Sequence, residues 1–384
     1  MKKLLLITLM TCFISADEFF EPTTSIGGYG EMHFDMEAND GDGKLDFHRF
    51  IIYYKHQFTP KWSMMSEIEV EHNMVGSSAA LGYKGGYLAM EQAHLNYWTG
   101  TWGFKGGVLL VPSGIINEYH EPPTFMSVER PEYAKYIIPT TWFDNGFAFY
   151  GTLMDNFNWN VTFTGDLDGD DISNGIRSAR EKGHYSKASS WTKTIQGSWT
   201  GMTGLKVGGS MTMNDAPASQ VEMSGDMNCG VTMDQPCNDE INREVVGVNL
   251  TEFNATYSAN NFYARMEYGM INYTDNLHQV MVDPDDEEDT GDEYYTGEIY
   301  EYESSSGYYF DLGYDIAPLI GCGDETNLYL WTRMSSYNRD DNADARDIKL
   351  FGVTYKPTNN ISFKFETGTA DDDDVMRVGL GYMF

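Results

Sequence analysis

Apolar and polar side chains alternate most regularly in Leu205-Lys206-Val207-Gly208-Gly209-Ser210-Met211-Thr212-Met213-Asn214. The apolar set is Leu205, Val207, Met211 and Met213, and the polar set is Lys206, Ser210, Thr212 and Asn214. A period of two residues places the two sets on opposite faces of a β-strand. The stretch therefore predicts a strand with one apolar and one polar face.

The same alternation recurs along the chain in segments of about ten residues. Sixteen strands are predicted, at 25–36, 45–58, 62–74, 86–97, 101–111, 145–154, 156–165, 191–200, 205–214, 244–257, 262–272, 307–316, 326–336, 347–356, 360–369 and 375–384. The long connections are 112–144, 166–190, 215–243 and 273–306, and they alternate with short ones such as Asn260-Asn261. Short turns at one end and long loops at the other are typical of membrane barrels. We therefore predict an all-β fold: one transmembrane antiparallel β-barrel of sixteen strands over residues 17–384.

The charged residues predict which face of the barrel meets lipid. Glu67, Glu69 and Glu71 share one face of the third predicted strand, and Met64, Ile68 and Val70 lie on the other. A carboxylate that faced hydrocarbon would cost on the order of 1–4 kcal/mol, so the glutamates are expected to face water inside the barrel. The aromatic content of 14% suits the girdles that form at the two membrane interfaces.

Both ends of the sequence carry signals of export. Residues 1–16 begin with Lys2 and Lys3, continue with an apolar run and end at Ala16, as a secretory signal peptide does. The last strand places Val378, Leu380, Tyr382 and Phe384 on one face. It resembles the C-terminal signal that the barrel-assembly machinery recognises, with Gly379, Tyr382 and Phe384 as the signal residues. The expected location is the outer membrane of a Gram-negative bacterium.

Composition excludes several other classes of protein. The formal net charge of −33 argues against nucleic-acid binding, which needs a basic surface. After the signal peptide, no run approaches the roughly 20 apolar residues of a membrane helix. Four cysteines are too few for a disulfide scaffold, although export would allow Cys229 to pair with Cys237. The acidic run 283–303 is interpreted as a mobile outer loop, with cation-mediated binding to lipopolysaccharide as the alternative.

Two groups of segments resemble a known family. The first group is Gly27-Gly28-Tyr29-Gly30-Glu31-Met32-His33, Asp46-Phe47-His48-Arg49-Phe50 and Ser66-Glu67-Ile68-Glu69-Val70-Glu71-His72. The second is Val111-Pro112-Ser113-Gly114-Ile115-Ile116-Asn117-Glu118, His120-Glu121-Pro122-Pro123-Thr124-Phe125, Val128-Glu129-Arg130-Pro131 and Ile138-Pro139-Thr140-Thr141-Trp142. These segments are similar to the porin-like outer-membrane proteins that are grouped with the phosphate-selective porins. The resemblance implies a trimeric, sixteen-stranded channel among outer-membrane lipids and lipopolysaccharide.

The resemblance also implies that the third extracellular loop folds into the barrel and narrows the pore. Residues 112–144 form the third long connection, and five prolines restrict their backbone. The candidate constriction residues are Glu118, His120, Glu121, Glu129, Arg130, Glu132 and Lys135. A solvated surface loop is the alternative, and Glu129 with Arg130 could be a structural pair.

The charges expected on the inner wall favour cations. The candidate cationic wall residues are Lys105, Lys206, Arg265, Lys364 and Arg377. The carboxylates on the same wall are Glu31, Glu67, Glu69, Glu71, Glu267, Asp311 and Glu366. Because carboxylates concentrate cations and repel phosphate, we predict a passive porin for small hydrophilic solutes or ions that prefers cations or neutral solutes. The alternatives are a phosphate- or anion-selective porin, as the resemblance implies, and a plugged receptor-type or structural barrel.

The sequence offers no sign of catalysis or of a cofactor. No nucleophile, base and orienting acid fall together, so no enzyme is expected. Six of the eight histidines lie in the first third of the chain: His33, His48, His56, His72, His94 and His120. With the nearby glutamates they could bind a metal, but no metal-ligand spacing occurs among them. They are interpreted as ordinary polar residues of the lumen, and no metal site is expected.

Overall fold

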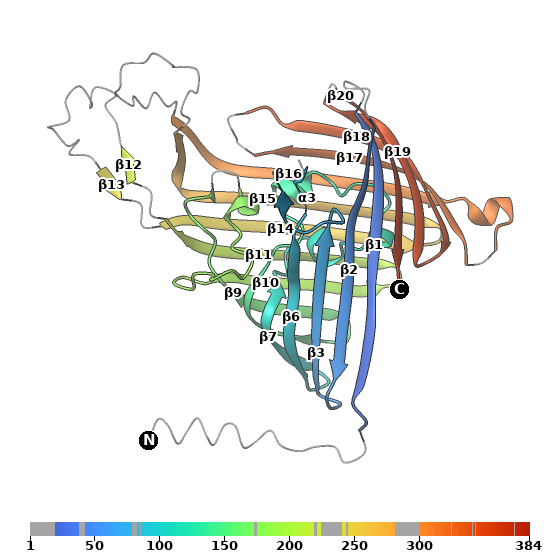
Figure 1. Cartoon of the computed structure of the whole chain (residues 1–384), viewed down its shortest axis with the longest axis horizontal. Helices are drawn as coiled ribbons and strands as arrows, with labels where there is room; N and C mark the ends of the chain where they lie inside the picture. Colours follow the sequence, from blue (N-terminus) through green and yellow to red (C-terminus); the bar gives the residue numbers. More distant parts are fainter. Residues whose placement is uncertain are drawn as a thin grey trace.

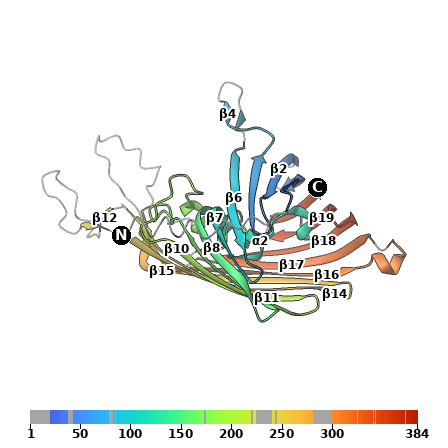
Figure 2. The same cartoon turned by 90° about the horizontal axis from the view of Figure 1, so that it is seen from below.

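The chain folds into a closed barrel of sixteen antiparallel strands (Figure 1 and Figure 2). The computed structural model describes residues 20–37, 43–78, 83–84, 86–172, 175–218, 221–223, 240–242, 245–280, 299–323, 325–339, 341, 343–371 and 373–384. The barrel strands are β1 (Thr23–Glu37), β2 (Gly43–Gln57), β3 (Trp62–Glu71), β6 (Leu88–Trp98), β7 (Trp102–Leu110), β8 (Phe143–Leu153), β9 (Phe157–Thr164), β10 (Thr192–Met202), β11 (Leu205–Pro217), β14 (Val245–Ala259), β15 (Phe262–Val280), β16 (Ile299–Asp315), β17 (Asn327–Asn338), β18 (Arg346–Thr358), β19 (Ile361–Ala370) and β20 (Asp373–Met383). The predicted fold class and strand number are confirmed.

Each strand pairs with the strands before and after it, and β20 pairs with β1 to close the sheet. The closing register runs from Tyr29 opposite Met383 to Glu37 opposite Val375. Closure leaves no edge strand, so the ladder satisfies the backbone N–H and C=O groups of the wall. This is the backbone arrangement that a chain needs in order to cross hydrocarbon with strands.

The connections at the two ends of the barrel differ in length, as predicted. Short ones include 203–204, 260–261 and 359–360, and long ones include 111–142 and 165–191. The connections also contain elements that the sequence analysis did not predict: β4 (Ser77–Ser78), β5 (Tyr83–Lys84), β12 (Val221–Met223), β13 (Glu240–Asn242), α2 (Ile115–Glu118), η1 (Pro122–Thr124), α3 (Tyr133–Tyr136), α4 (Ile176–Ala179) and η3 (Ala317–Ile320). Among the described residues, no helix has the length and apolar character needed to cross a membrane.

The wall separates apolar from charged side chains. Large apolar side chains such as Met211, Phe253 and Phe351 are exposed on its outer face. Glu67 and Glu69, which were predicted to face the lumen, are buried.

The interior differs from the prediction of a purely polar lumen. An apolar core lies inside the barrel, where Phe125 and Ile138 of the connection after β7 pack with Leu250 of β14 and Leu350 of β18. Leu167, Ile172 and α4, from the connection after β9, belong to the same core. The wall is apolar at these positions because it meets folded chain there and does not meet water.

Three predictions lie outside the described residues. They are the signal peptide at residues 1–16, the pairing of Cys229 with Cys237, and most of the acidic run 283–303. Cys322, in the connection between β16 and β17, is an exposed free thiol.

Candidate functional site

The connection between β7 and β8 crosses the interior of the barrel, and we call residues 111–142 the inner segment. It begins at Val111, whose N–H donates to the carbonyl of Trp142 at 2.9 Å, so the segment leaves and rejoins the wall at one place. Gly114, with φ of 83°, turns the chain into α2, and a Cβ there would contact Ile138 at 2.8 Å. Figure 1 shows α3 inside the barrel beside β16.

Charged side chains of the wall bind the backbone of the inner segment. The ammonium group of Lys364 donates to the carbonyls of Pro122 and Ser127, both at 2.7 Å. Arg265 donates to the carbonyl of Thr124 at 2.9 Å. Both residues were predicted as cations of the inner wall. In the structure they contact the inner segment, and Arg265 also lines a cavity.

Carboxylates of the wall bind the same backbone through its N–H groups. Glu267 accepts from Ile115 N–H at 3.0 Å, and Glu366 accepts from Val128 N–H at 2.7 Å. Hydrogen bonds from β15 and β19 therefore hold the inner segment inside the barrel.

Most of the remaining charged wall residues form ion pairs or lie over aromatic rings. Arg49, which the sequence analysis missed, contacts Glu31 at 2.5 Å and Glu69 at 3.3 Å. Arg377 contacts Asp35 at 3.2 Å and Glu366 at 3.1 Å. Two lysines lie over rings: Lys105 over Tyr150, at 5.3 Å from the centroid, and Lys206 over Tyr119, at 4.8 Å. Glu71 is half-buried and lines the largest cavity.

Several candidate constriction residues contact the wall. Glu129 accepts from His33 at 2.6 Å. Glu132 accepts from Tyr337 and from Arg346, both at 3.0 Å. These contacts fix the inner segment on the side of the long connections.

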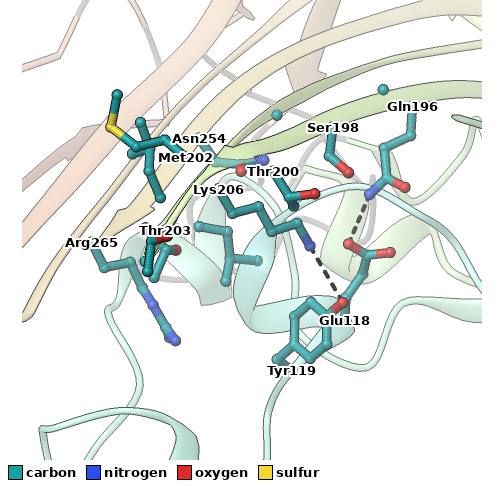
Figure 3. A pocket seen from close by; sticks show the side chains of 16 residues that line it. Glu118, Tyr119, Gln196, Ser198, Thr200, Met202, Thr203, Lys206, Asn254 and Arg265 are labelled. Carbon is teal, nitrogen blue, oxygen red and sulfur yellow. Dashed lines mark hydrogen bonds between the residues drawn. The ribbon is translucent and has the colours of Figure 1, made fainter. Parts of the chain in front are cut away.

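Three more candidates lie beside cavities. Glu118 accepts from Gln196 at 2.7 Å (Figure 3). Arg130 and Lys135 line the largest cavity, and Lys135 is exposed there.

The surroundings of the inner segment shift the pKa values of its acids. Burial raises the pKa of Glu118 above its ordinary value. Burial also acts to raise the pKa of Glu129, but the hydrogen bond from His33 and the positive charges of His33 and His48 outweigh it and lower this pKa to about 2. Glu129 is therefore ionised at neutral pH.

Among the described residues, two groups of histidine and carboxylate bring their ligand atoms close enough together to hold one metal ion. His120 contacts Glu67 and Glu91, and Glu121 accepts a hydrogen bond from Tyr53 at 3.3 Å beside them. Burial acts to lower the pKa of His120, but its contacts with the two glutamates raise this pKa well above the ordinary value.

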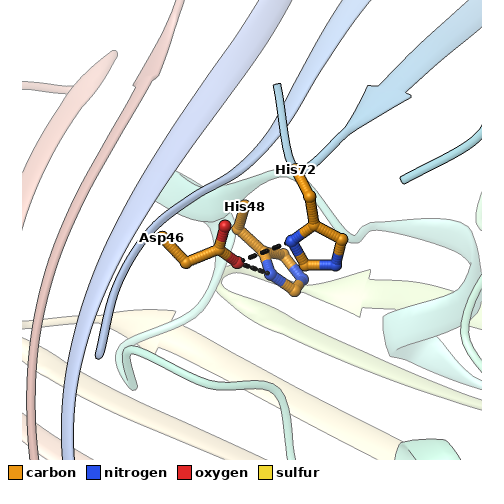
Figure 4. Close-up of side chains that lie close together, drawn as sticks. All are labelled: Asp46, His48 and His72. Carbon is orange, nitrogen blue, oxygen red and sulfur yellow. Dashed lines mark hydrogen bonds and ion pairs between the residues drawn. The ribbon is translucent and has the colours of Figure 1, made fainter. Parts of the chain in front are cut away.

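The second cluster shares one carboxylate oxygen. Asp46 accepts from His48 at 3.1 Å and from His72 at 2.8 Å (Figure 4). These hydrogen bonds use Nδ1 of both histidines. His72 is exposed to solvent.

Open cavities lie on both sides of the inner segment. Among the cavities lined by described residues, the largest has a volume of about 620 Å³ and lies toward the long connections. Its Lys and Arg lining is Arg49, Arg130, Lys135, Arg177, Arg180, Lys182, Arg333, Arg346 and Arg377, and its acidic lining is Asp35, Glu71, Glu129 and Glu132. A cavity of about 460 Å³ lies beside Glu118, Lys206 and the turn between β10 and β11 (Figure 3).

Sequence reasoning missed Glu91 and the arginines of the connection after β9. A signal for Glu91 was present, because the outward apolar positions of β6 change phase between Met90 and Leu95. Such a change indicates a β-bulge. Arg177, Arg180 and Lys182 carried no periodic signal, because an irregular connection has no face that a sequence pattern could reveal.

The candidate assembly residues lie where the barrel closes. Gly379 faces the inner segment, and a Cβ there would contact Val128 at 2.8 Å. The rings of Tyr382 and Phe384 stack with centroids 6.5 Å apart, and Phe384 exchanges two backbone hydrogen bonds with Gly28.

Comparison with known sequences gives a partial relative. A comparison with protein families finds no match. An uncharacterized protein of Aquifex aeolicus (strain VF5) is 46% identical over 129 residues, which cover 33% of this chain and 29% of that relative. The match thus spans less than a third of the relative's length.

Solved structures of similar fold are outer-membrane porins. Salmonella typhi OmpF, solved in complex with daunomycin, has a TM-score of 0.59 and 14% identity, over 94% of this chain and 97% of that chain. A trimer form of Vibrio cholerae OmpT has a TM-score of 0.54 and 11% identity, over 95% and 100%. An anion-selective porin from Comamonas acidovorans has a TM-score of 0.55 and 8% identity, over 95% and 100%. At these identities the likeness shows the fold alone.

Proposed function

We propose that this chain is a passive channel for small hydrophilic solutes or ions in the outer membrane of a Gram-negative bacterium. The observation that carries the proposal is a closed barrel with an apolar outer face and open cavities on both sides of an inner segment. The fold shared with outer-membrane porins supports it. Diffusion through such a channel needs no catalytic group and no cofactor.

We further propose that the channel prefers anions, the alternative that the family resemblance implied. Six of the seven wall carboxylates that favoured cations are at most 2% exposed: Glu31, Glu67, Glu69, Glu267, Asp311 and Glu366. Their charge is paired or covered by the inner segment. The largest cavity has nine Lys and Arg side chains and four Asp and Glu side chains in its lining. Three of these cations, Arg49, Arg333 and Arg377, are paired with the buried wall carboxylates and add little to the field. The six others still outnumber the four acids of the lining. A cavity of positive field concentrates anions and repels cations.

The reversal potential in a KCl gradient tests this preference. The parent is expected to pass Cl⁻ in preference to K⁺, and added phosphate is expected to reduce the chloride current. The double variant Arg177→Gln/Lys182→Gln removes two charges from the cavity lining and should shift the reversal potential toward the cation side.

A charge-matched control is available on the outer face. Lys193→Gln/Lys349→Gln removes two exposed lysines that each lie between buried residues of β10 and β18, outside the cavity lining. This variant should leave the reversal potential unchanged. A parent that prefers K⁺ would favour the cation-leaning channel of the sequence analysis instead.

The apolar core inside the barrel favours a second candidate, a plugged structural or receptor-type barrel. Residues that pack in this way could close the lumen. Conductance separates the two functions, because a plugged barrel reconstituted in a bilayer should pass no current at any salt concentration.

We propose the same partners as the sequence analysis. The chain assembles as a homotrimer, lies among the lipids and lipopolysaccharide of the outer membrane, and is inserted by the barrel-assembly machinery. One structural neighbour, Vibrio cholerae OmpT, has a trimer form, which supports the same assembly here.

A further inference from the structure

Three ionisable side chains from separate parts of the sequence meet at one buried point of the barrel wall. Glu67 lies on β3, Glu91 on β6 and His120 on the inner segment. Nε2 of His120 lies 3.4 Å from Oε1 of Glu67 and 3.4 Å from Oε2 of Glu91. All three side chains are at most 2% exposed.

A β-bulge brings Glu91 into this group. In the ladder between β3 and β6, Glu67 pairs with Gln92 but Ile68 pairs with Met90, so Glu91 is an extra residue without a cross-strand partner. A bulge re-aims the side chain of the extra residue. Without the bulge, Glu91 would share the outward face of Leu95. With the bulge, both Glu91 and Gln92 face inward beside Glu67.

In His120 and in Glu67, the polar atom that faces away from the cluster makes a hydrogen bond to another residue. Nδ1 of His120 donates to the carbonyl of Asn117 at 3.0 Å, which leaves Nε2 to face the glutamates. Oε2 of Glu67 accepts from Gln92 at 2.6 Å, which leaves Oε1 to face His120. Hydrogen bonds of this kind orient the ligands of metal ions in proteins.

The atoms that face one another lack hydrogen bonds. Among the described residues, Nε2 of His120, Oε1 of Glu67 and both oxygens of Glu91 are buried without a hydrogen-bond partner. Buried polar atoms are rarely left in this state, and an ion is one of the occupants that accounts for it.

We propose that Glu67, Glu91 and His120 bind one divalent transition-metal ion, with Zn²⁺ as the best fit, which fastens the inner segment to the wall. Two ligands of one Zn²⁺, at bond lengths of about 2.0–2.2 Å and the tetrahedral angle, lie about 3.3–3.6 Å apart. Both contacts of 3.4 Å fall in this range. An imidazole nitrogen also favours Zn²⁺ over Ca²⁺ and Mg²⁺, which prefer oxygen ligands.

A cavity lies beside the three side chains. Glu67 and His120 line a cavity of about 410 Å³ that also contains Tyr53, Lys55 and Glu121. The cavity can supply water for a fourth position. This proposal goes beyond channel function, and its test measures no current.

The test uses the purified full-length barrel in detergent, stripped with EDTA, titrated with Zn²⁺ and desalted. Every protein carries His72→Gln, which removes the other described cluster, that of Asp46, His48 and His72. The expected result is one bound Zn²⁺ per chain and a higher midpoint of thermal unfolding. Glu91→Gln and His120→Gln should each lose both effects.

The matched control is His94→Gln, because His94 is another inward histidine of β6 that is buried without hydrogen bonds. It should keep the bound Zn²⁺. A parent that retains no Zn²⁺, or Glu91→Gln and His120→Gln variants that retain it, would overturn the proposal and leave an ion pair between a protonated His120 and the glutamates.

X-ray absorption of the Zn²⁺-loaded parent decides the matter even if the variants do not fold. One imidazole with carboxylate oxygens at about 2.0–2.2 Å supports the site. A shell of oxygen alone, or one with two or more imidazoles, contradicts it.

Discussion

Arg333 shows what a single buried charge does in this barrel. Its guanidinium donates to both oxygens of Asp311, at 2.6 and 2.7 Å, and to the carbonyl of Glu129 at 3.3 Å. The two side chains of the pair are each 1% exposed. One arginine therefore joins β17 to β16 and to the inner segment.

Substitution Arg333→Met should lower the free energy of unfolding by about 3–5 kcal/mol, because it leaves Asp311 buried without its partner. Urea unfolding in phospholipid vesicles, followed by tryptophan fluorescence, measures the loss. Arg346→Met is the control: Arg346 pairs with Glu132 and Asp371 in a half-exposed position, so its loss should cost only about 0–1 kcal/mol. Equal costs for the two variants would contradict this account.

Glu129 gives the stability a dependence on pH. Its pKa is lowered to about 2, against about 4.3 in an unfolded chain. The stability that ionised Glu129 contributes is therefore fully present above the unfolded pKa and is lost as the pH falls through the folded one. Between roughly pH 5 and pH 2 the unfolding midpoint should fall less steeply in Glu129→Gln than in the parent. Parallel pH profiles would show that the His33 contact contributes nothing.

At the scale of elements, the inner segment decides the shape of the lumen. Its short helices α2 and α3 are too brief to be stable alone, so the wall holds them through backbone hydrogen bonds and apolar packing. Glycines of β20 allow the close approach: a Cβ at Gly381 would overlap Pro122. The β20 glycine pattern thus has a packing role besides the predicted assembly signal.

Replacing residues 120–136 with a short Gly-Ser linker should raise single-channel conductance, because it removes the part of the inner segment that crosses the lumen. Planar-bilayer recordings measure the change. Replacing residues 318–322, which are exposed in and after η3, with a similar linker should leave conductance at the parental value. A conductance equal to the parent's in the first variant would place the constriction elsewhere.

At the scale of the whole molecule, the exposed apolar side chains of the barrel strands match a bilayer. A row of apolar side chains that large would be unfavourable in water, whereas hydrocarbon accepts it. The charged side chains on the inner face of the strands and the apolar side chains on the outer face are two consequences of one alternating pattern.

Met211 lies on the outer face near the middle of β11. Met211→Arg should reduce the free energy of unfolding in phospholipid vesicles by about 2–4 kcal/mol, because it places a charge near the bilayer midplane. Leu319→Arg, in η3 beyond the strands, should cost about 0–1 kcal/mol. A small cost at both positions would mean that the apolar face does not contact lipid.

The strands could be predicted closely, and the site could be predicted only in part. The alternation of β11 predicted 205–214, and the strand observed is Leu205–Pro217. The inner segment lies within the long, proline-rich connection 112–144 that the sequence analysis proposed to fold inward. The partners of the wall charges were not foreseen. Lys364 and Arg265 were predicted only as cations of the inner wall, and the structure shows that they bind the backbone of the inner segment.

The sequence by itself determined the strands of the barrel, because a period of two residues is a local property that can be seen within ten consecutive residues of one strand. It also determined which face is apolar. Only the tertiary structure decided the electrostatics of the lumen, since a charge acts on a solute only where no other residue covers it. Which wall carboxylates the inner segment covers, and where Glu91 meets His120, depend on contacts between residues far apart in the chain. No local pattern encodes those contacts.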